Sequence, residues 1–144
     1  GCNIIEWSFN VSKQIRSVSE RKIVIRTPQL EKKYKKKWID KLMNINNTIF
    51  QIGTKKNLIP TLKSCHCTIT YTSGLSVDSL INGCPTIACN DGNFCYEVSQ
   101  NDPLEVEKIT YFDRTQWINN LSYCQWDLVE IKSGKCWDHI KKLI

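Results

Sequence analysis

Short runs rich in β-branched residues alternate with amphipathic segments through most of the chain. The runs lie at residues 22–26, 48–53, 67–72 and 85–89, and each ends within three residues of a glycine or proline. Segments with the apolar spacing of helices lie at residues 4–18, 30–44, 58–64 and 76–82. Strands joined by helices over short connections predict a parallel sheet with helices on both faces. The sequence therefore predicts an α/β fold, a Rossmann-like doubly wound sheet of about four strands.

The pattern changes after Pro103, where helical spacing replaces the alternation. Helices are predicted at residues 104–108, 113–124, 127–131 and 136–143, with Asp113 as an N-cap and Gly134 separating the last two. The chain holds no internal repeat, low-complexity segment or linker-like stretch. We expect a single domain over residues 1–144, with an α/β core at 1–102 and a helical tail at 103–144.

Length and composition place the chain among globular proteins. Its 144 residues suit one domain with a core, and 41% of them are hydrophobic against 24% charged. No apolar run approaches the ~18 residues of a membrane-spanning helix, and the first residues lack the pattern of a leader peptide. The expectation is a cytoplasmic protein without a membrane partner.

Charge is distributed unevenly within a formal net charge of +6. Residues 1–64 hold fourteen lysines and arginines and four acidic residues, whereas residues 65–144 hold six and ten. Most of the excess lies between Lys32 and Lys37, in the predicted second helix. Two interpretations stay open: a solvated helix face, or a surface that contacts nucleic acid, phosphate or a membrane. One alanine against sixteen lysines also fits an AT-rich gene, so nucleic acid is a weak candidate partner.

Eight cysteines in an apparently cytosolic chain favour reduced thiols over a disulfide framework. Cys65 and Cys67 flank His66, and Cys89 precedes Cys95, but this spacing is not typical of a zinc finger or ribbon. Free cysteine is often buried, so these side chains are expected to pack in the interior. No metal and no other cofactor is expected.

Ligands of open parallel sheets bind beyond the carboxyl ends of the strands. Four polar segments follow the predicted strands, at residues 26–29, 53–56, 72–76 and 90–93. The third is the strongest, because Ser73 and Gly74 form a strand-to-helix turn. Free backbone N–H groups and the helix dipole at such a turn favour phosphate, with Leu75 and Ser76 in the first turn.

The remaining rim residues each have two interpretations. Asp78 could accept hydrogen bonds from ribose hydroxyls or only offset the helix dipole, and Ser76 could only cap the helix. Arg26 could pair with phosphate bidentately or form a structural ion pair. Asp91 could contact a sugar hydroxyl or only shape its turn.

Residues 73–87 contain Ser-Gly, an acidic residue four positions after the glycine, then Gly-x-Pro and a strand. This pattern resembles the donor-binding, C-terminal domain of GT-B glycosyltransferases, and the related UDP-N-acetylglucosamine 2-epimerases and capsule-polysaccharide enzymes. Residues 6–26 and the tryptophan-rich residues 113–137 are similar to bacteriophage proteins of this glycosyltransferase-like type. In those families the helix start holds the diphosphate of a nucleotide sugar and the acidic residue holds the ribose.

The resemblance implies a domain that binds a UDP- or GDP-sugar, in the host cytoplasm if the protein is viral. Ser73 and Gly74 would hold the diphosphate, Asp78 the ribose, Arg26 a phosphate, and the turn at Gly53 and Thr54 the base. The chain has room for one of the two GT-B domains and lacks the histidine that usually follows the first strand. No catalytic residue is therefore named, and sugar transfer stays open.

Two alternative functions remain. One is a non-catalytic nucleotide- or protein-binding module of phage origin, and the other is a basic protein associated with nucleic acid. A homodimer is a further expectation, because the rim of this domain normally faces a second domain.

Overall fold

The computed structural model describes residues 3–27 and 32–142, and for residues 32–37 and 55 it describes the backbone alone. The chain divides into two compact units, residues 1–111 and 112–144, and each is described by itself. The boundary lies shortly after the one expected between core and tail. That both units belong to one domain stays a prediction.

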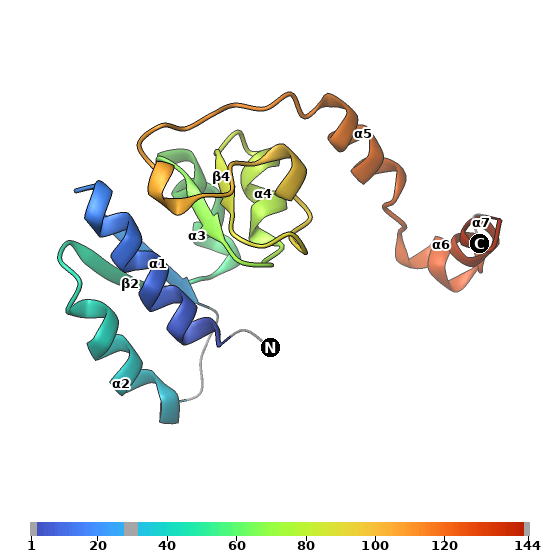
Figure 1. Cartoon of the computed structure of the whole chain (residues 1–144). Helices are drawn as coiled ribbons and strands as arrows, with labels where there is room; N and C mark the ends of the chain where they lie inside the picture. Colours follow the sequence, from blue (N-terminus) through green and yellow to red (C-terminus); the bar gives the residue numbers. More distant parts are fainter. Residues whose placement is uncertain (1–2, 28–31, 143–144) are drawn as a thin grey trace. The chain divides into compact units, whose positions relative to one another are not determined.

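The first unit alternates helices and strands in the predicted order (Figure 1). Its elements are α1 (Ile4–Val18), β1 (Ile23–Thr27), α2 (Lys32–Met43), β2 (Thr48–Ile52), α3 (Lys55–Ser64), β3 (Thr68–Thr70), α4 (Leu75–Ile81) and β4 (Thr86–Ala88), followed by the 3₁₀ turns η1 (Tyr96–Val98) and η2 (Pro103–Glu105). The α/β class is therefore confirmed.

The strands form two parallel pairs, and the expected continuous sheet of about four strands is not formed by the described residues. β1 pairs with β2 from Ile23 opposite Thr48 onward, and β3 pairs with β4 from Thr68 opposite Thr86 onward. Side chains rather than backbone hydrogen bonds join the two pairs. Ile23 of β1 and Ile69 of β3 both pack against a buried cluster that contains Ile15 of α1. The apolar pattern in the sequence accounts for this shared core but does not specify backbone pairing between β1 and β3.

The sheet of β3 and β4 contacts α4 and a buried cluster that includes Ile15 of α1. Ile69 of β3 packs against this cluster. Side chains alternate along a strand, so Thr68 faces the opposite side. Its hydroxyl donates to Ser79 Oγ of α4 at 2.9 Å and lies 2.9 Å from Thr86 Oγ1. The α1 side of this sheet is thus apolar, and the α4 side is held by hydroxyl groups.

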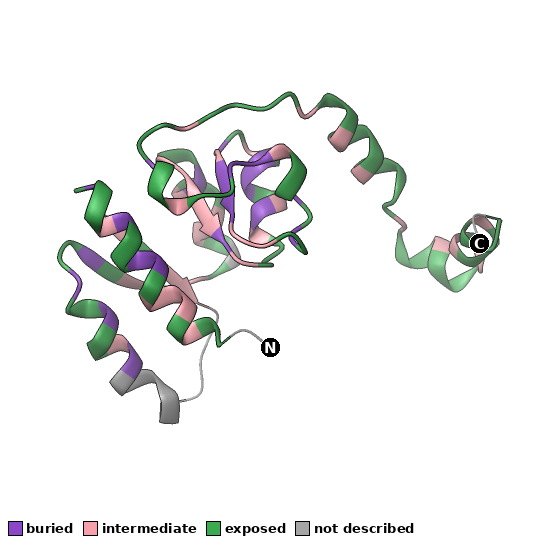
Figure 2. Cartoon of the chain, in the orientation of Figure 1, coloured by how far each residue is buried: buried purple, intermediate pink, exposed green. Residues whose placement is uncertain are grey.

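A second buried cluster joins α1 and α2 to the first sheet. Trp38 and Leu42 of α2 and Ile45, two residues after it, form its centre. The partly buried Ile5, Phe9, Ile25 and Phe50 pack around them. The rings of Trp38 and Phe50 meet edge to face, with centroids 5.6 Å apart. Figure 2 shows buried positions alternating with exposed ones along α1 and the described part of α2.

Two predicted elements differ in extent or type. The helix predicted at 58–64, with Pro60 in its first turn, begins at Lys55, so Pro60 lies inside it. The earlier start follows from Asn57, whose side chain accepts a hydrogen bond from the Thr54 N–H at 3.0 Å. The helix predicted at 104–108 is the short 3₁₀ turn η2, begun by Asp102, whose side chain accepts from the Leu104 N–H.

The second unit contains α5 (Thr115–Tyr123), α6 (Leu128–Lys132) and α7 (Lys135–Ile140). Asp113 accepts hydrogen bonds from the N–H and hydroxyl of Thr115, and the N–H contact lowers the pKa of the Asp113 carboxyl. Gly134 separates α6 from α7 with a φ of 82°, as predicted. Trp137 of α7 is 63% exposed. Over the described ranges, no helix has the length and apolar character to cross a bilayer.

Candidate functional site

The carboxyl ends of β1 and β2 bring three predicted rim residues together. The Arg26 guanidinium donates through Nη2 to Asn57 Oδ1 at 2.9 Å and to the Thr54 carbonyl at 3.3 Å. A Cβ added to Gly53 would lie 3.2 Å from the same Nη2. Because Gly53 has no side chain, the guanidinium has room to reach the start of α3. We call Arg26, Gly53, Thr54 and Asn57 the arginine corner.

Three buried polar atoms of β1 and β2, one of them in the arginine corner, lack hydrogen-bond partners. Arg26 Nη1, Thr27 Oγ1 and Gln51 Oε1 are buried and make no hydrogen bond. Arg26 and Gln51 are paired in register on the neighbouring strands. Because buried polar groups are normally hydrogen-bonded, these atoms leave donors and an acceptor for a polar ligand. Pro28 and Gln29, also predicted at the rim, lie outside the described residues.

The loops after β3 and β4 form a second polar neighbourhood. Ser76 is fully buried and donates to Asn93 Oδ1 at 2.9 Å. The Asn93 amide donates in turn to Thr70 Oγ1 at 3.0 Å and to the Tyr71 carbonyl at 2.9 Å. Asn90 donates to the Tyr71 hydroxyl at 3.2 Å. Ser76 and Asn93 therefore hold the two loops together, and this structural role leaves Ser76 no access to a ligand.

The turn at Ser73 and Gly74 differs from the expectation of several free N–H groups. The Leu75 N–H donates to Ser73 Oγ at 3.2 Å, and the Ser76 N–H donates to the Ser73 carbonyl at 3.1 Å. The Val77 N–H is bonded to the Gly74 carbonyl. Ser73 and Gly74 are exposed, and nothing lies within 4 Å of a Cβ built on Gly74. The turn is thus open to solvent, but the first helical N–H groups are already used.

The two predicted acidic residues lie on the surface. Asp78 is exposed in the first turn of α4, and Asp91 is exposed in the loop after β4. In the described part of the chain, neither carboxylate makes a hydrogen bond or ion pair within the protein. Leu75 is half-buried at the start of α4. Both carboxylates are therefore open to solvent.

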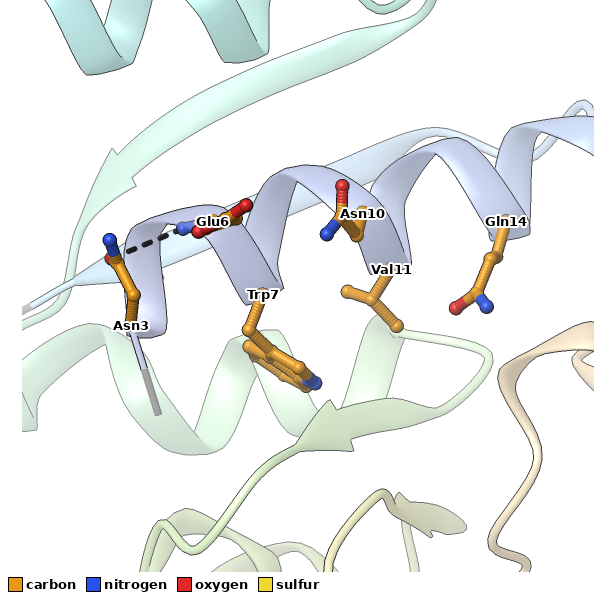
Figure 3. A pocket seen from close by; sticks show the side chains of 6 residues that line it. All are labelled: Asn3, Glu6, Trp7, Asn10, Val11 and Gln14. Carbon is orange, nitrogen blue, oxygen red and sulfur yellow. Dashed lines mark hydrogen bonds between the residues drawn. The ribbon is translucent and has the colours of Figure 1, made fainter. Parts of the chain in front are cut away.

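A hollow of about 380 Å³ lies along the amino-terminal part of α1. Figure 3 shows the side chains that line it, which are Asn3, Glu6, Trp7, Asn10, Val11 and Gln14. The Trp7 ring meets the Tyr71 ring edge to face, with centroids 5.5 Å apart. Since Tyr71 directly follows β3, the hollow adjoins the loop that leads to Ser73. A ring, a carboxylate and amides in one hollow suit a ligand with several hydroxyl groups.

A basic groove lies between the carboxyl-terminal halves of α1 and α2. It has a volume of about 470 Å³ and is lined by Phe9, Lys13, Arg16, Ser17, Lys41, Asn44, Ile45 and Asn46. The Lys41 ammonium lies 4.1 Å from the Phe9 ring centroid, and the Lys13 ammonium lies 5.5 Å from it. The side chains of the run from Lys32 to Lys37 lie outside the described residues.

The two histidines make structural contacts. His66 Nε2 lies 2.9 Å from the Val106 carbonyl, and the His139 ring packs against the rings of Tyr123 and Trp126. Among the described residues, no three His, Cys, Asp or Glu side chains are grouped so that they could hold a metal ion.

Comparisons of the chain with models of protein families, with curated proteins and with solved structures find no match.

Sequence reasoning missed Asn57 and Asn93, which organise the two polar neighbourhoods. Asn57 stands three residues after Thr54, a spacing typical of a residue that bonds back to the helix cap. Asn93 closes a turn-rich segment in which every residue suits a loop, so nothing in the sequence singles it out.

Proposed function

We propose that the first unit binds a phosphate-bearing nucleotide, and specifically a nucleotide sugar, at the carboxyl ends of its strands. The observation that carries the proposal is the arginine corner, where a guanidinium with an unpartnered, buried Nη1 lies over a glycine. A phosphate oxygen is the acceptor that best matches a guanidinium donor. The same strand ends are where parallel α/β sheets bind nucleotides.

The second neighbourhood supplies the groups for the rest of the ligand. The Ser73 hydroxyl is exposed beside the open turn at Gly74, and Asp78 follows on the first turn of α4. A carboxylate accepts hydrogen bonds from vicinal hydroxyls such as those of ribose. The hollow beside Trp7 and Tyr71 offers a ring face and amide groups for the sugar. The resemblance to GT-B donor-binding domains supports the same assignment.

Calorimetric titration of the full chain with UDP, GDP and their sugars tests the proposal. We expect saturable binding of at least one of these ligands, with thermal stabilisation of about 2.7 kcal/mol at ~100 times the dissociation constant. A chain that binds none of them at millimolar concentration would overturn the proposal.

Matched arginine variants test the arginine corner. Arg26→Gln removes the guanidinium and is expected to weaken nucleotide binding by ~10–100-fold, because a hydrogen bond to a charged group contributes about 1.5–3 kcal/mol. Arg21→Gln is the control, since Arg21 precedes β1 and pairs with Glu107. Arg26→Lys preserves the charge if Arg26→Gln fails to fold. Equal affinities for wild type and both Arg26 variants would remove this residue from the site.

Asp78→Asn separates the ribose contact from the phosphate contact. The variant should bind the nucleotide more weakly and inorganic diphosphate unchanged, because only the nucleotide carries ribose. Because Asp78 is exposed, the substitution should not impair folding, so weaker binding would not come from a folding defect. Equal losses for both ligands would contradict the ribose assignment.

The basic groove favours a second candidate function, contact with nucleic-acid phosphates. Lys13, Arg16 and Lys41 line it, and Arg16 Nε is buried without a partner. Affinity for an oligonucleotide should then fall steeply between about 50 and 200 mM salt. The double variant Lys13→Gln and Lys41→Gln should reduce the slope of log affinity against log salt concentration by about 2.

The control for the groove is the double variant Lys63→Gln and Lys108→Gln, which removes the same charge from exposed positions outside it. If both double variants change the slope equally, the effect comes from net charge and the groove is not the contact.

A further inference from the structure

Two thiols from different elements meet at the amino ends of β3 and β4. Cys65 ends α3 just before β3, and Cys84 follows α4 just before β4. Their sulfur atoms lie 3.2 Å apart. The parallel pairing explains the meeting, because it brings the two segments that enter the strands side by side. The Thr68 N–H also donates to the Pro85 carbonyl at 2.9 Å, next to the pair.

The two thiols are unequal in burial and ionisation. Cys84 is 3% exposed, whereas Cys65 is half-buried. The hydrogen bond from the Cys84 thiol stabilises the Cys65 thiolate and lowers the pKa of Cys65 to about 7. The same bond raises the pKa of Cys84. The contact therefore favours a nucleophilic thiolate on Cys65 beside a protonated thiol on Cys84.

Nearby cysteines lack this combination. Burial raises the pKa of Cys67 to about 12 and that of Cys89 to about 11. Cys95 is fully buried, and burial raises its pKa as well. Cys124 is exposed but lies in the second unit at the end of α5. Cys65 thus combines a lowered pKa with a second thiol in contact with it.

We propose that Cys65 and Cys84 form a redox-active dithiol that a small peroxide converts to an intramolecular disulfide. The Cys65 thiolate attacks one oxygen of hydrogen peroxide, the O–O bond breaks, and a sulfenic acid and hydroxide form. The hydroxide takes up a proton from solvent, equivalent to the one that the Cys65 thiol released, and leaves as water. The Cys84 sulfur then attacks the sulfenic sulfur, the S–O bond breaks, and the Cys84 proton leaves with the hydroxide as a second water. The pair loses two electrons and two protons, and peroxide is reduced to two waters.

The sulfur atoms are already close to the distance of a disulfide bond. The sulfur atoms must approach from 3.2 Å to about 2.05 Å. The closed loop would span residues 65–84 and so include β3, α4 and the turn at Ser73 and Gly74. Oxidation should therefore raise the melting temperature, because the bond restricts the unfolded chain.

Peroxide treatment of the folded full chain tests the proposal. Free thiols are blocked with N-ethylmaleimide, and peptides are mapped by mass spectrometry before and after reduction. We expect a cross-linked peptide pair that contains Cys65 and Cys84 and disappears with dithiothreitol. Its absence under conditions that oxidise the exposed Cys124 would overturn the proposal.

Serine variants distinguish a redox-active pair from two cysteines that only pack in the interior. In Cys84→Ser the sulfenic acid of Cys65 should persist and react with dimedone. Cys89→Ser, the control, should still form the cross-link. The rate of Cys65 alkylation by iodoacetamide should have its midpoint near pH 7 in wild type and at higher pH in Cys84→Ser. A cross-link that forms only in denaturant, or equal midpoints in both proteins, would contradict the proposal.

Discussion

Gly53 and Gly74 are both glycines at strand-to-helix turns, but only Gly53 faces a crowded space. A Cβ at Gly53 would lie 3.2 Å from Arg26 Nη2 and 3.4 Å from the Thr27 carbonyl, whereas a Cβ at Gly74 would meet nothing within 4 Å. The backbone φ of Gly74 is −58°, a value that alanine adopts readily. The two residues thus have different roles although their sequence contexts look alike.

Alanine substitutions distinguish these roles. Gly53→Ala should destabilise the chain by about 1 kcal/mol, because the guanidinium must move away. Gly74→Ala should be neutral or stabilise by up to ~1 kcal/mol, since it lowers the entropy of the unfolded chain. Urea denaturation of both variants measures the difference. A Gly53→Ala chain as stable as Gly74→Ala would show that the guanidinium does not occupy this space.

Glu107 is held by the segment that joins α1 to β1. It accepts hydrogen bonds from the Ser19 hydroxyl and from Arg21 Nε, the latter at 3.1 Å. The Ser19 contact, and then Arg21, lowers the pKa of the Glu107 carboxyl. A carboxylate whose pKa is lower in the folded state stabilises the protein at pH values above its ordinary, unfolded-state pKa. This stabilisation is lost as the pH falls through the lower, folded-state pKa.

Glu107→Gln should therefore lower the urea midpoint at pH 7, and the difference from wild type should shrink as pH falls below about 4.5. Glu97→Gln is the control, because Glu97 is an exposed residue of η1. Urea denaturation at pH 7 and at pH 3 measures both variants. A deficit of the same size at both pH values would show that the carboxylate charge is not responsible.

At the scale of elements, burial of one helix face accounts for the placement of α2. Leu42 is 1% exposed between α1 and the first sheet, whereas the adjacent Met43 is 46% exposed. The lysine-rich sequence of α2 gives this helix little apolar surface, so the few buried residues should carry most of its packing energy.

Leu42→Ala is expected to cost about 2–5 kcal/mol, because it leaves a cavity in a closed cluster. Met43→Ala, on the exposed side of the same helix, should change stability by no more than ~0.5 kcal/mol. Thermal denaturation followed by circular dichroism compares the two. Similar losses for both would contradict the packing of α2 through Leu42.

For the whole molecule, the buried clusters lie within residues 1–111. Both consist of residues from the first unit, and among the described residues of α5, α6 and α7 none is buried. A core that is complete within one unit should fold without the other.

A chain truncated after Tyr111 should therefore unfold cooperatively, with a melting temperature close to that of the full chain. Residues 112–144 alone should show little fixed tertiary structure, since a packed core is needed to hold short helices. Calorimetry of the truncated and full chains checks the first expectation. A loss of cooperative unfolding on truncation would show that the second unit completes the core.

Most of the secondary structure could be predicted because it depends on local features. The β-branched run at residues 23–25 and the break at Gly134 both appear in the structure near their predicted positions. Pairing of the strands could not be predicted, since apolar alternation buries side chains equally well in one sheet or in two. Three residues predicted at the rim, Arg26, Gly53 and Thr54, lie together at the strand ends, but Asn57 and Asn93 gained their roles only through long-range contacts.

The sequence alone determined the class of fold, the order of its elements and the polar character of the strand ends, because periodicity and turn residues act over a few positions. Only the tertiary structure decided which polar groups meet. It placed Arg26 over Gly53, buried Ser76 against Asn93, and brought Cys65 beside Cys84 across a gap of nineteen positions. Such meetings depend on parallel pairing and packing between distant segments, which no local pattern specifies.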